Sequence, residues 1–205
     1  MGSENSHYFD DDPASPSAPR QVELVLPDLT TTLASDSGVF SSETVDPGTR
    51  SLLLGVPDPL PTVKTALDLG CGYAPIARTL CHRAPRARVW AVDVNERALD
   101  LARTNLAGLN ATITRPDEVP DHVRFDLIWS NPPIRIGKSP LHELLETWLD
   151  RMAPDGQAFL VVHKHLGADS LASWLGDNGW PTTRVRSRNG YRLLRLTART
   201  AEEPQ

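Results

Sequence analysis

Residues 130–134 combine hydrogen-bond acceptors with two adjacent prolines, directly after an apolar run. The segment reads Ser130-Asn131-Pro132-Pro133-Ile134. Pro132 drives Asn131 into an extended conformation, and neither proline has an N–H to donate. The side-chain oxygen of Asn131 and the neighbouring backbone carbonyls therefore form a stiff set of acceptors. Such a set suits the two hydrogens of an amine.

An amine attached to an aromatic ring is a poor nucleophile, because its lone pair is delocalised into the ring. Two acceptors that hold its hydrogens can turn the lone pair toward an incoming group and stabilise the positive charge developing on nitrogen. This chemistry needs no metal and no covalent nucleophile. The chain has two cysteines and six histidines, without metal-ligand spacing, and we predict no metal site. A rigid structural loop is the alternative interpretation.

A glycine-containing turn forms a second candidate site. It reads Asp68-Leu69-Gly70-Cys71-Gly72-Tyr73-Ala74-Pro75. Glycines let the backbone come close to a ligand. A dinucleotide fingerprint would need a glycine where Pro75 stands, so that fingerprint fails. Asp93 ends the next expected strand and can accept hydrogen bonds from both ribose hydroxyls of a nucleoside. The alternative is an ordinary tight turn with an exposed acid.

Alternating strands and helices position these segments. We expect strands at 65–69, 88–92, 111–114, 125–129 and 158–162, with helices between them. Ser139 and Pro140 indicate the start of one helix, whose apolar positions recur from Leu141 to Met152. This pattern predicts an α/β fold with a parallel sheet covered by helices on both faces. In such sheets ligands bind beyond the carboxyl ends of the strands.

We divide the chain into a flexible arm (1–20), an N-terminal hairpin with a short helix (21–62) and the main α/β domain (63–200). The hairpin strands are expected at 22–26 and 29–33, and the short helix at 50–54. The Asn189-Gly190 dipeptide predicts a second hairpin that joins the last two strands.

Composition limits the possible partners. The 205 residues carry a net charge of −5, which weighs against binding nucleic acid by charge alone. However, residues 180–200 hold six arginines and no acid. No apolar run approaches the roughly 18 residues of a membrane span, and no secretory signal is evident. With two cysteines expected to be reduced thiols, we expect a cytoplasmic protein without membrane association.

The glycine turn resembles the first motif of class I S-adenosylmethionine (SAM) methyltransferases, and 131–133 resemble the N-P-P motif of amino-nitrogen methyltransferases. The chain as a whole resembles the methyltransferase small domain of ribosomal RNA guanine-N2 methyltransferases, in particular the family of small-subunit methyltransferase C. The matching stretches are Gly38-Val39-Phe40-Ser41, Val45-Asp46-Pro47-Gly48-Thr49 with Leu52-Leu53-Leu54, Asp68 to Gly72, and Asn131-Pro132-Pro133. The resemblance implies a Rossmann-like sheet of seven strands.

The resemblance also implies roles for individual residues. Those expected to bind SAM, which would leave as S-adenosylhomocysteine, are Asp68, Gly70, Cys71, Gly72, Asp93, Val94 and Asp117. Those expected at the reacting centre are Asn131, Pro132, Pro133 and Ile134. Phe40 and Lys138 are expected to contact the substrate. Two positions depart from the family pattern, because Ala74 replaces a glycine and Ile134 replaces an aromatic residue.

The expected function is SAM-dependent methylation of the exocyclic N2 amine of a guanine, with ribosomal RNA or the small ribosomal subunit as partner. Two alternatives stay open: an N-methyltransferase acting on protein glutamine or a small aromatic amine, and a weakly catalytic SAM-binding assembly factor. The best-known family members carry two copies of the domain and this sequence carries one, so the exact nucleotide is not implied. Oligomeric state is not predicted.

Overall fold

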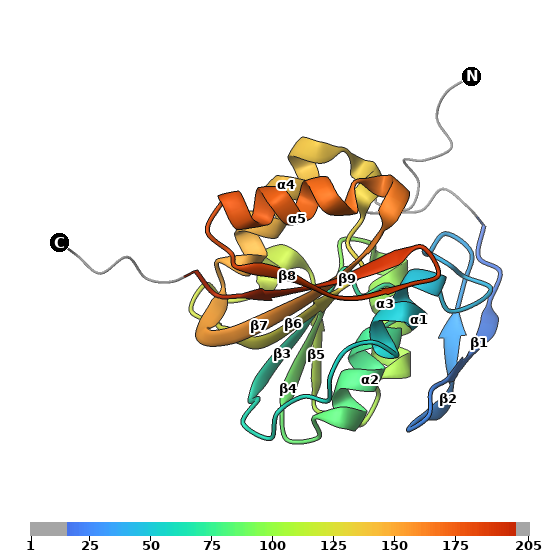
Figure 1. Ribbon diagram of the computed structural model, residues 1–205. Helices are drawn as coiled ribbons and strands as arrows, with labels where there is room; N and C mark the ends of the chain where they lie inside the picture. Colours follow the sequence, from blue (N-terminus) through green and yellow to red (C-terminus); the bar gives the residue numbers. More distant parts are fainter. Residues whose placement is uncertain (1–15, 200–205) are drawn as a thin grey trace.

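The computed structural model describes residues 16–199 and contains a seven-stranded sheet (Figure 1). The strand order is β5-β4-β3-β6-β7-β9-β8, and β9 is the one strand of this sheet that runs opposite to the other six. The strands are β3 (Thr65–Leu69), β4 (Arg88–Val92), β5 (Ala111–Thr114), β6 (Phe125–Ser130), β7 (Met152–His163), β8 (Thr182–Arg188) and β9 (Tyr191–Thr197). The predicted α/β class and seven-stranded sheet are confirmed.

Helices cover both faces of the sheet. One face packs against α1 (Pro47–Leu53), α2 (Pro75–Arg83) and α3 (Glu96–Asn105), and the other against α4 (Lys138–Leu149) and α5 (Ala168–Asp177). Neighbouring residues of β6 show this division, since Ile128 packs with the α4–α5 core and Trp129 with the α1–α3 core. Three short 3₁₀ turns complete the fold: η1 (Pro116–Glu118), η2 (Ile134–Ile136) and η3 (Lys164–Leu166).

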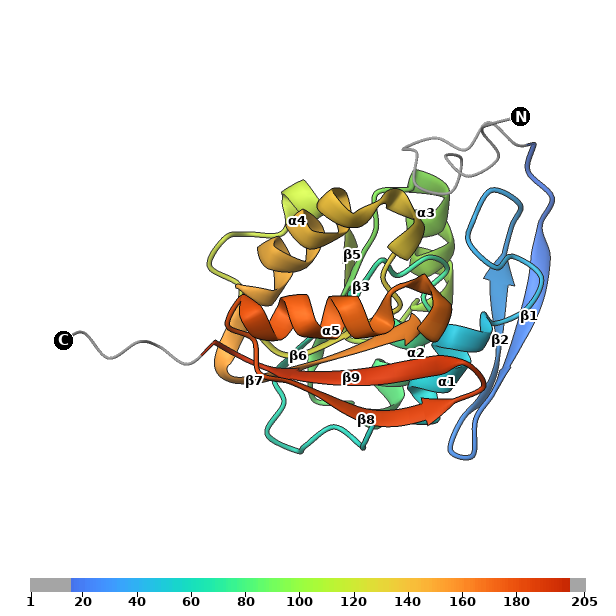
Figure 2. The same ribbon diagram turned by 45° about the horizontal axis from the view of Figure 1, so that its top comes forward.

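A separate antiparallel hairpin precedes the sheet and lies beside α1, α2 and α3 (Figure 2). It consists of β1 (Arg20–Val25) and β2 (Thr30–Ser35). Arg83 on α2 donates two hydrogen bonds to Asp28 at the hairpin turn, of 2.7 and 2.8 Å. Asn105 on α3 pairs with the backbone N–H and carbonyl of Ala34 at 2.7 and 2.8 Å. These contacts position the loop that follows β2.

Several boundaries differ from the sequence-based expectations. The hairpin strands lie at 20–25 and 30–35 rather than 22–26 and 29–33. Helix α1 begins at Pro47 rather than Arg50, because Asp46 caps it. Helix α4 begins at Lys138 with Gly137 as its N-cap, so Ser139 lies inside the first turn and is not the cap. Met152 starts β7 instead of continuing the helix. The expected arm lies mostly outside the described residues, and the proposed domain limits stay predictions.

No helix within residues 16–199 is long and apolar enough to cross a bilayer. The same part of the chain contains no cluster of three or more His, Cys, Asp or Glu side chains that could hold a metal ion.

Candidate active site

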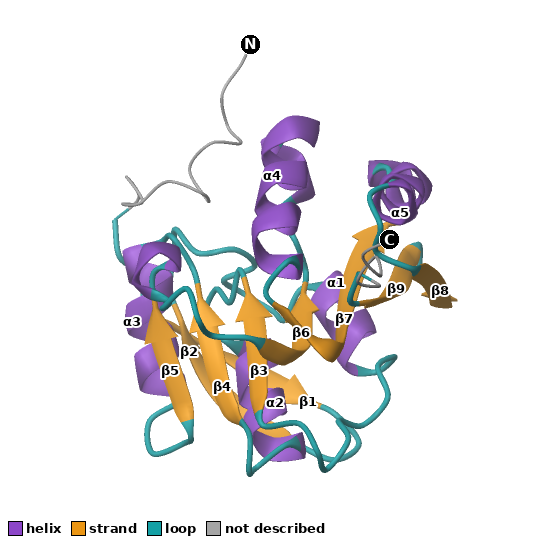
Figure 3. Ribbon diagram, turned by 90° about the vertical axis from the view of Figure 1, so that its left-hand side faces the viewer, coloured by secondary structure: helices purple, strands orange, loops and turns teal. Residues whose placement is uncertain are grey.

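The two predicted motifs meet at one edge of the sheet. The arrowheads of β3, β4, β5 and β6 point to this edge (Figure 3). Strands β3 and β6 are neighbours with Leu69 opposite Ser130, and the Ser130 hydroxyl donates to the Leu69 carbonyl at 2.7 Å. Gly70 and Asn131 directly follow these two residues. The glycine turn and the Asn-Pro-Pro segment therefore leave the sheet side by side, as the sequence predicted.

The glycine turn has backbone angles that favour glycine at two positions. Gly70 has φ +74° and Gly72 has φ +53°, and no described atom lies within 4 Å of where a Cβ would stand. The Gly70 and Cys71 amides donate to the Val92 carbonyl, and the Gly72 amide donates to Asp93 at 2.8 Å. The turn is thus fastened to the end of β4 while its outer side is open. A ligand can approach the backbone there.

Asp68 is a fully buried acid beneath this turn. Its Oδ2 accepts from the Ala77 amide at 2.8 Å, whereas no described residue hydrogen-bonds Oδ1. Burial, with a smaller contribution from the charge of Asp93, raises the pKa of Asp68 to about 8. An unpartnered buried oxygen of this kind fits a ligand that brings a positive charge or a donor.

Asp93 lies at the end of β4. It accepts from the Gly72 and Asn95 amides at 2.8 and 3.0 Å. Burial raises its pKa, against these backbone donors, which lower it. A carboxylate has further lone pairs beyond those two bonds, so Asp93 can still accept from vicinal hydroxyls.

The other predicted cofactor residues have less distinctive surroundings. The Cys71 side chain packs into the α1–α3 core, where burial raises its pKa, so its backbone rather than its thiol faces the turn. The Val94 carbonyl accepts from Arg115 at 2.8 Å. Asp117 lies in η1 with a side chain 78% exposed, 3.6 Å from Arg115.

The Asn131 side chain is held through its nitrogen. Nδ2 donates to Asp46 Oδ2 at 2.8 Å and to Thr49 Oγ1 at 3.1 Å. Among the described residues, no donor hydrogen-bonds Asn131 Oδ1. The amide oxygen is thereby left to accept from a ligand. This is the arrangement that amine binding needs.

The two prolines after Asn131 also present carbonyls. The Pro132 carbonyl accepts from the Ile134 amide at 2.8 Å and the Pro133 carbonyl from the Ile136 amide at 3.1 Å. Each carbonyl oxygen keeps a second lone pair. Ile134 is half-buried and packs against the α4–α5 core.

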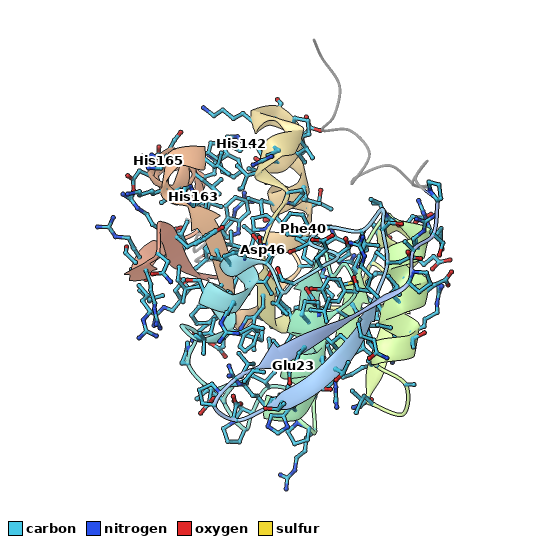
Figure 4. The ribbon with its side chains drawn as sticks, turned by 90° about the vertical axis from the view of Figure 1, so that its right-hand side faces the viewer. Glu23, Phe40, Asp46, His142, His163 and His165 are labelled. Carbon is cyan, nitrogen blue, oxygen red and sulfur yellow. The ribbon has the colours of Figure 1, made fainter. Side chains whose placement is uncertain are left out.

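The loop after β2 reaches the same edge. Asn95 donates to the Gly38 carbonyl at 3.1 Å and Arg97 to the Ser37 carbonyl at 2.7 Å, which holds the loop near the end of β4. Phe40 is 49% exposed, and Figure 4 labels it together with Asp46. Lys138 is exposed at the start of α4.

Asp46 and Thr49 were not predicted as site residues. The sequence Asp-Pro-Gly-Thr does indicate a helix start at these residues. Asp is a favoured N-cap residue, Pro is favoured at the first helical position, and the Asp46 side chain accepts from the Thr49 amide three residues later. The pattern gave no indication that this cap would also contact Asn131.

Residues 30–195 match the model of the methyltransferase small domain. The chain belongs to the methyltransferase small domain family. A relative from Bacillus subtilis, the uncharacterized protein YbxB, is 32% identical over 197 residues, which cover 93% of this chain and 98% of YbxB. The ribosomal RNA small subunit methyltransferase C of Aeromonas hydrophila is 35% identical over 62% of this chain and 37% of its own length.

Among solved structures, the fold is similar to that of the T. thermophilus 16S rRNA N2 methyltransferase in complex with AdoMet and guanosine, with a TM-score of 0.75 and 24% identity. That match covers 90% of this chain and 52% of the other. The chain thus spans about half, or less, of the length of these ribosomal RNA methyltransferases.

This family member is a SAM-dependent methyltransferase. The residues at the edge fit the cofactor. The open glycine turn accommodates a ligand against the backbone, the unpartnered Asp68 oxygen suits a cationic group, and Asp93 suits a ribose.

Proposed function

We propose that this methyltransferase modifies the exocyclic N2 amine of a guanine in ribosomal RNA. The observation that carries the proposal is the orientation of Asn131, whose nitrogen is engaged by the protein and whose oxygen is left as an acceptor. An NH₂ group has two hydrogens and can donate to both the Asn131 oxygen and a neighbouring backbone carbonyl. A hydroxyl has one hydrogen to donate, and a carbon atom that receives the methyl group has none of this kind, so neither would use both hydrogen-bond acceptors. The names of the relatives support ribosomal RNA as the class of substrate.

Bound SAM supplies an electrophilic methyl group. The Asn131 oxygen and the Pro132 carbonyl accept hydrogen bonds from the two N–H groups of the amine, which turns its lone pair out of conjugation with the ring. As the nitrogen–methyl bond forms, the sulfonium–methyl bond would break, S-adenosylhomocysteine would leave, and the methylated nitrogen would lose its extra proton to solvent. Both acceptors are fixed before the substrate arrives, so no reorganisation is needed as positive charge develops on nitrogen. The chain needs no metal or covalent nucleophile for this step.

Around this centre, the backbone of Gly70, Cys71 and Gly72 contacts the methionine part of SAM, and Asp68 faces its charged end. Asp93 accepts from the ribose. In the same proposal, Val94 and Asp117 border the adenine. Phe40 and Ile134 contact the faces of the target base, and Lys138 contacts a phosphate.

Basic residues around the turn between β8 and β9 support a nucleic-acid substrate. A pocket of about 240 Å³ lies at the turn between β8 and β9, and Lys164, Arg188 and Arg192 are among its lining residues. Tyr191, at the start of β9, also lines this pocket and packs close to Gly48 in α1, beside Asp46. Tyr191 therefore links the basic pocket to the region of Asp46. Phosphates of an RNA strand complement this pocket.

Mass spectrometry of ribosomal RNA nucleosides from a strain lacking the protein tests the proposal. We expect one N2-methylguanosine to disappear and to return with the wild-type chain. Assays with tritiated SAM on bare ribosomal RNA, assembled small subunits and protein extract complete the test. An unchanged nucleoside profile, or label found only in protein glutamine, would refute the assignment.

A further inference from the structure

We propose that Asp46 and Thr49 are positioning residues that fix which end of the Asn131 amide faces the substrate. The inference rests on the proposed function, in which the Asn131 oxygen accepts a hydrogen bond from the substrate amine. It adds a reason why that oxygen is free to accept. The contact joins α1 to the end of β6 across 85 residues of sequence.

The chemistry of the contact determines the amide orientation. The Asp46 carboxylate only accepts hydrogen bonds when ionised, so the group 2.8 Å from it must be the NH₂ of Asn131. Thr49 Oγ1 accepts from the same nitrogen at 3.1 Å. A half-turn of the amide would place its oxygen against the carboxylate and present NH₂ to the incoming amine. Both consequences are unfavourable. Asp46 and Thr49, together called the anchor, therefore select the amide orientation in which the Asn131 oxygen faces the substrate.

The anchor is itself rigid. Asp46 Oδ2 also accepts from the Thr49 amide at 2.9 Å and thereby caps α1. Thr49 is only 5% exposed. A Cβ on Gly48 would stand 2.8 Å from Asp46 Oδ2 and 2.8 Å from the Tyr191 ring, so glycine lets these groups close around the carboxylate. Burial and the nearby charge of Asp46 raise the pKa of Tyr191.

Capping alone does not account for this arrangement. An N-cap needs one acceptor for a backbone N–H of its own helix. Here the same oxygen serves a second donor on a different element, and the Thr49 hydroxyl, which the cap does not use, serves that donor too.

Single-turnover transfer from tritiated SAM to ribosomal RNA from the deletion strain separates positioning from capping. Thr49→Val keeps the shape of the side chain and the backbone cap but removes Oγ1. We expect the rate to fall about 3- to 10-fold. Asp46→Ser keeps a good capping residue but is too short to reach Asn131. Because a bond to a charged partner is lost, we expect a fall of about 10- to 100-fold.

In both variants the dissociation constant for SAM and the melting temperature should stay near those of the wild type. Thr49→Ser, which retains the hydroxyl, should restore most of the rate. Thr147→Val is a matched control on α4, where the hydroxyl only bonds the Glu143 carbonyl. Wild-type rates in Thr49→Val and Asp46→Ser, or a rate loss that follows the melting temperature, would overturn the proposal.

A second measurement needs no acceptor substrate. In ¹⁵N-resolved spectra, the side-chain NH₂ of Asn131 should exchange with water more slowly than that of exposed Asn189, and Thr49→Val and Asp46→Ser should accelerate it. Equal exchange of Asn131 and Asn189 in the wild type would contradict the anchor. A protected Asn131 amide in a protein that methylates no RNA would refute the proposed function and leave the anchor standing.

Discussion

The carboxyl edge of the sheet has two halves with opposite chemistry. On the β3–β4 side two carboxyl groups, Asp68 and Asp93, are buried, and burial raises the pKa of both. On the β7–β9 side the pocket at the hairpin turn is lined by Lys164, Arg188 and Arg192. The positive charge of a sulfonium cofactor favours the ionised form of the two buried acids, and the phosphates of RNA complement the cations, so each ligand suits one half. The two halves of one sheet edge can therefore bind the cofactor and the RNA at separate places, and neither ligand competes for the half that suits the other.

Asn131 stands between these halves, because β6 lies between β3 and β7 in the sheet. It is uncharged, and its orientation comes from the anchor on α1 rather than from either half. We infer that cofactor affinity, RNA affinity and transfer rate depend on separate groups. The following variants test that separation.

Asn131→Ala should have the largest effect. Removal of one preorganised acceptor should lower the transfer rate about 10²- to 10³-fold, by analogy with the loss of one oxyanion-hole donor. The dissociation constant for SAM, measured by calorimetry, should hardly change. A comparable loss of cofactor affinity would show that Asn131 belongs to the acidic half instead.

Asp93→Ala should weaken SAM binding about 10- to 100-fold, because hydrogen bonds to a charged group are lost. Affinity for RNA should be unaffected. Asp100→Ala removes an exposed acid on α3 and serves as the control in the same titration. Similar SAM affinities for the two variants would remove Asp93 from the cofactor site.

Lys164→Glu combined with Arg188→Glu should weaken RNA binding about 10-fold near 0.1 M salt and leave SAM binding unchanged. The slope of log affinity against log salt should become shallower by about 1 for each phosphate interaction that the substitutions remove. Arg86→Glu combined with Arg103→Glu, two exposed positions away from the hairpin pocket, is the matched double charge reversal. An equal loss in this control would indicate a general charge effect without a basic binding surface.

Asp68→Asn should show its effect in the pH dependence of stability. The folded-state pKa of about 8 exceeds the value of about 3.9 in an unfolded chain, so the folded protein binds the extra proton. The free energy of unfolding should therefore fall as pH rises from about 4 to about 8. Asp68→Asn should flatten this dependence in urea titrations. Parallel pH profiles for the two proteins would show that Asp68 titrates normally.

Local patterns made much of this fold predictable. The glycine turn, the strand before it and the Asn189-Gly190 hairpin depend on neighbouring residues, and the structure has them where expected. Three helix limits were wrong. Two depend on neighbouring residues, since Asp46 caps α1 and Gly137, with φ +107°, precedes the start of α4. The third depends on a distant residue, because pairing with Phe125 draws Met152 into β7.

The anchor of Asn131 could not be predicted for a related reason. Asp46 and Thr49 look like an ordinary helix cap in the sequence, and only the packing of α1 beside the sheet brings them to the end of β6. The role of Asn131 was inferred from its own neighbours. The groups that orient it lie on another element.

A crystal structure with S-adenosylhomocysteine and guanosine tests the central claim most directly. We expect the cofactor product between Gly70 and Asp93, with its sulfur directed toward the guanosine amine and the Asn131 oxygen accepting from that amine. Density for the cofactor product away from the glycine turn, or an Asn131 oxygen hydrogen-bonded to the protein in place of the base, would contradict the account.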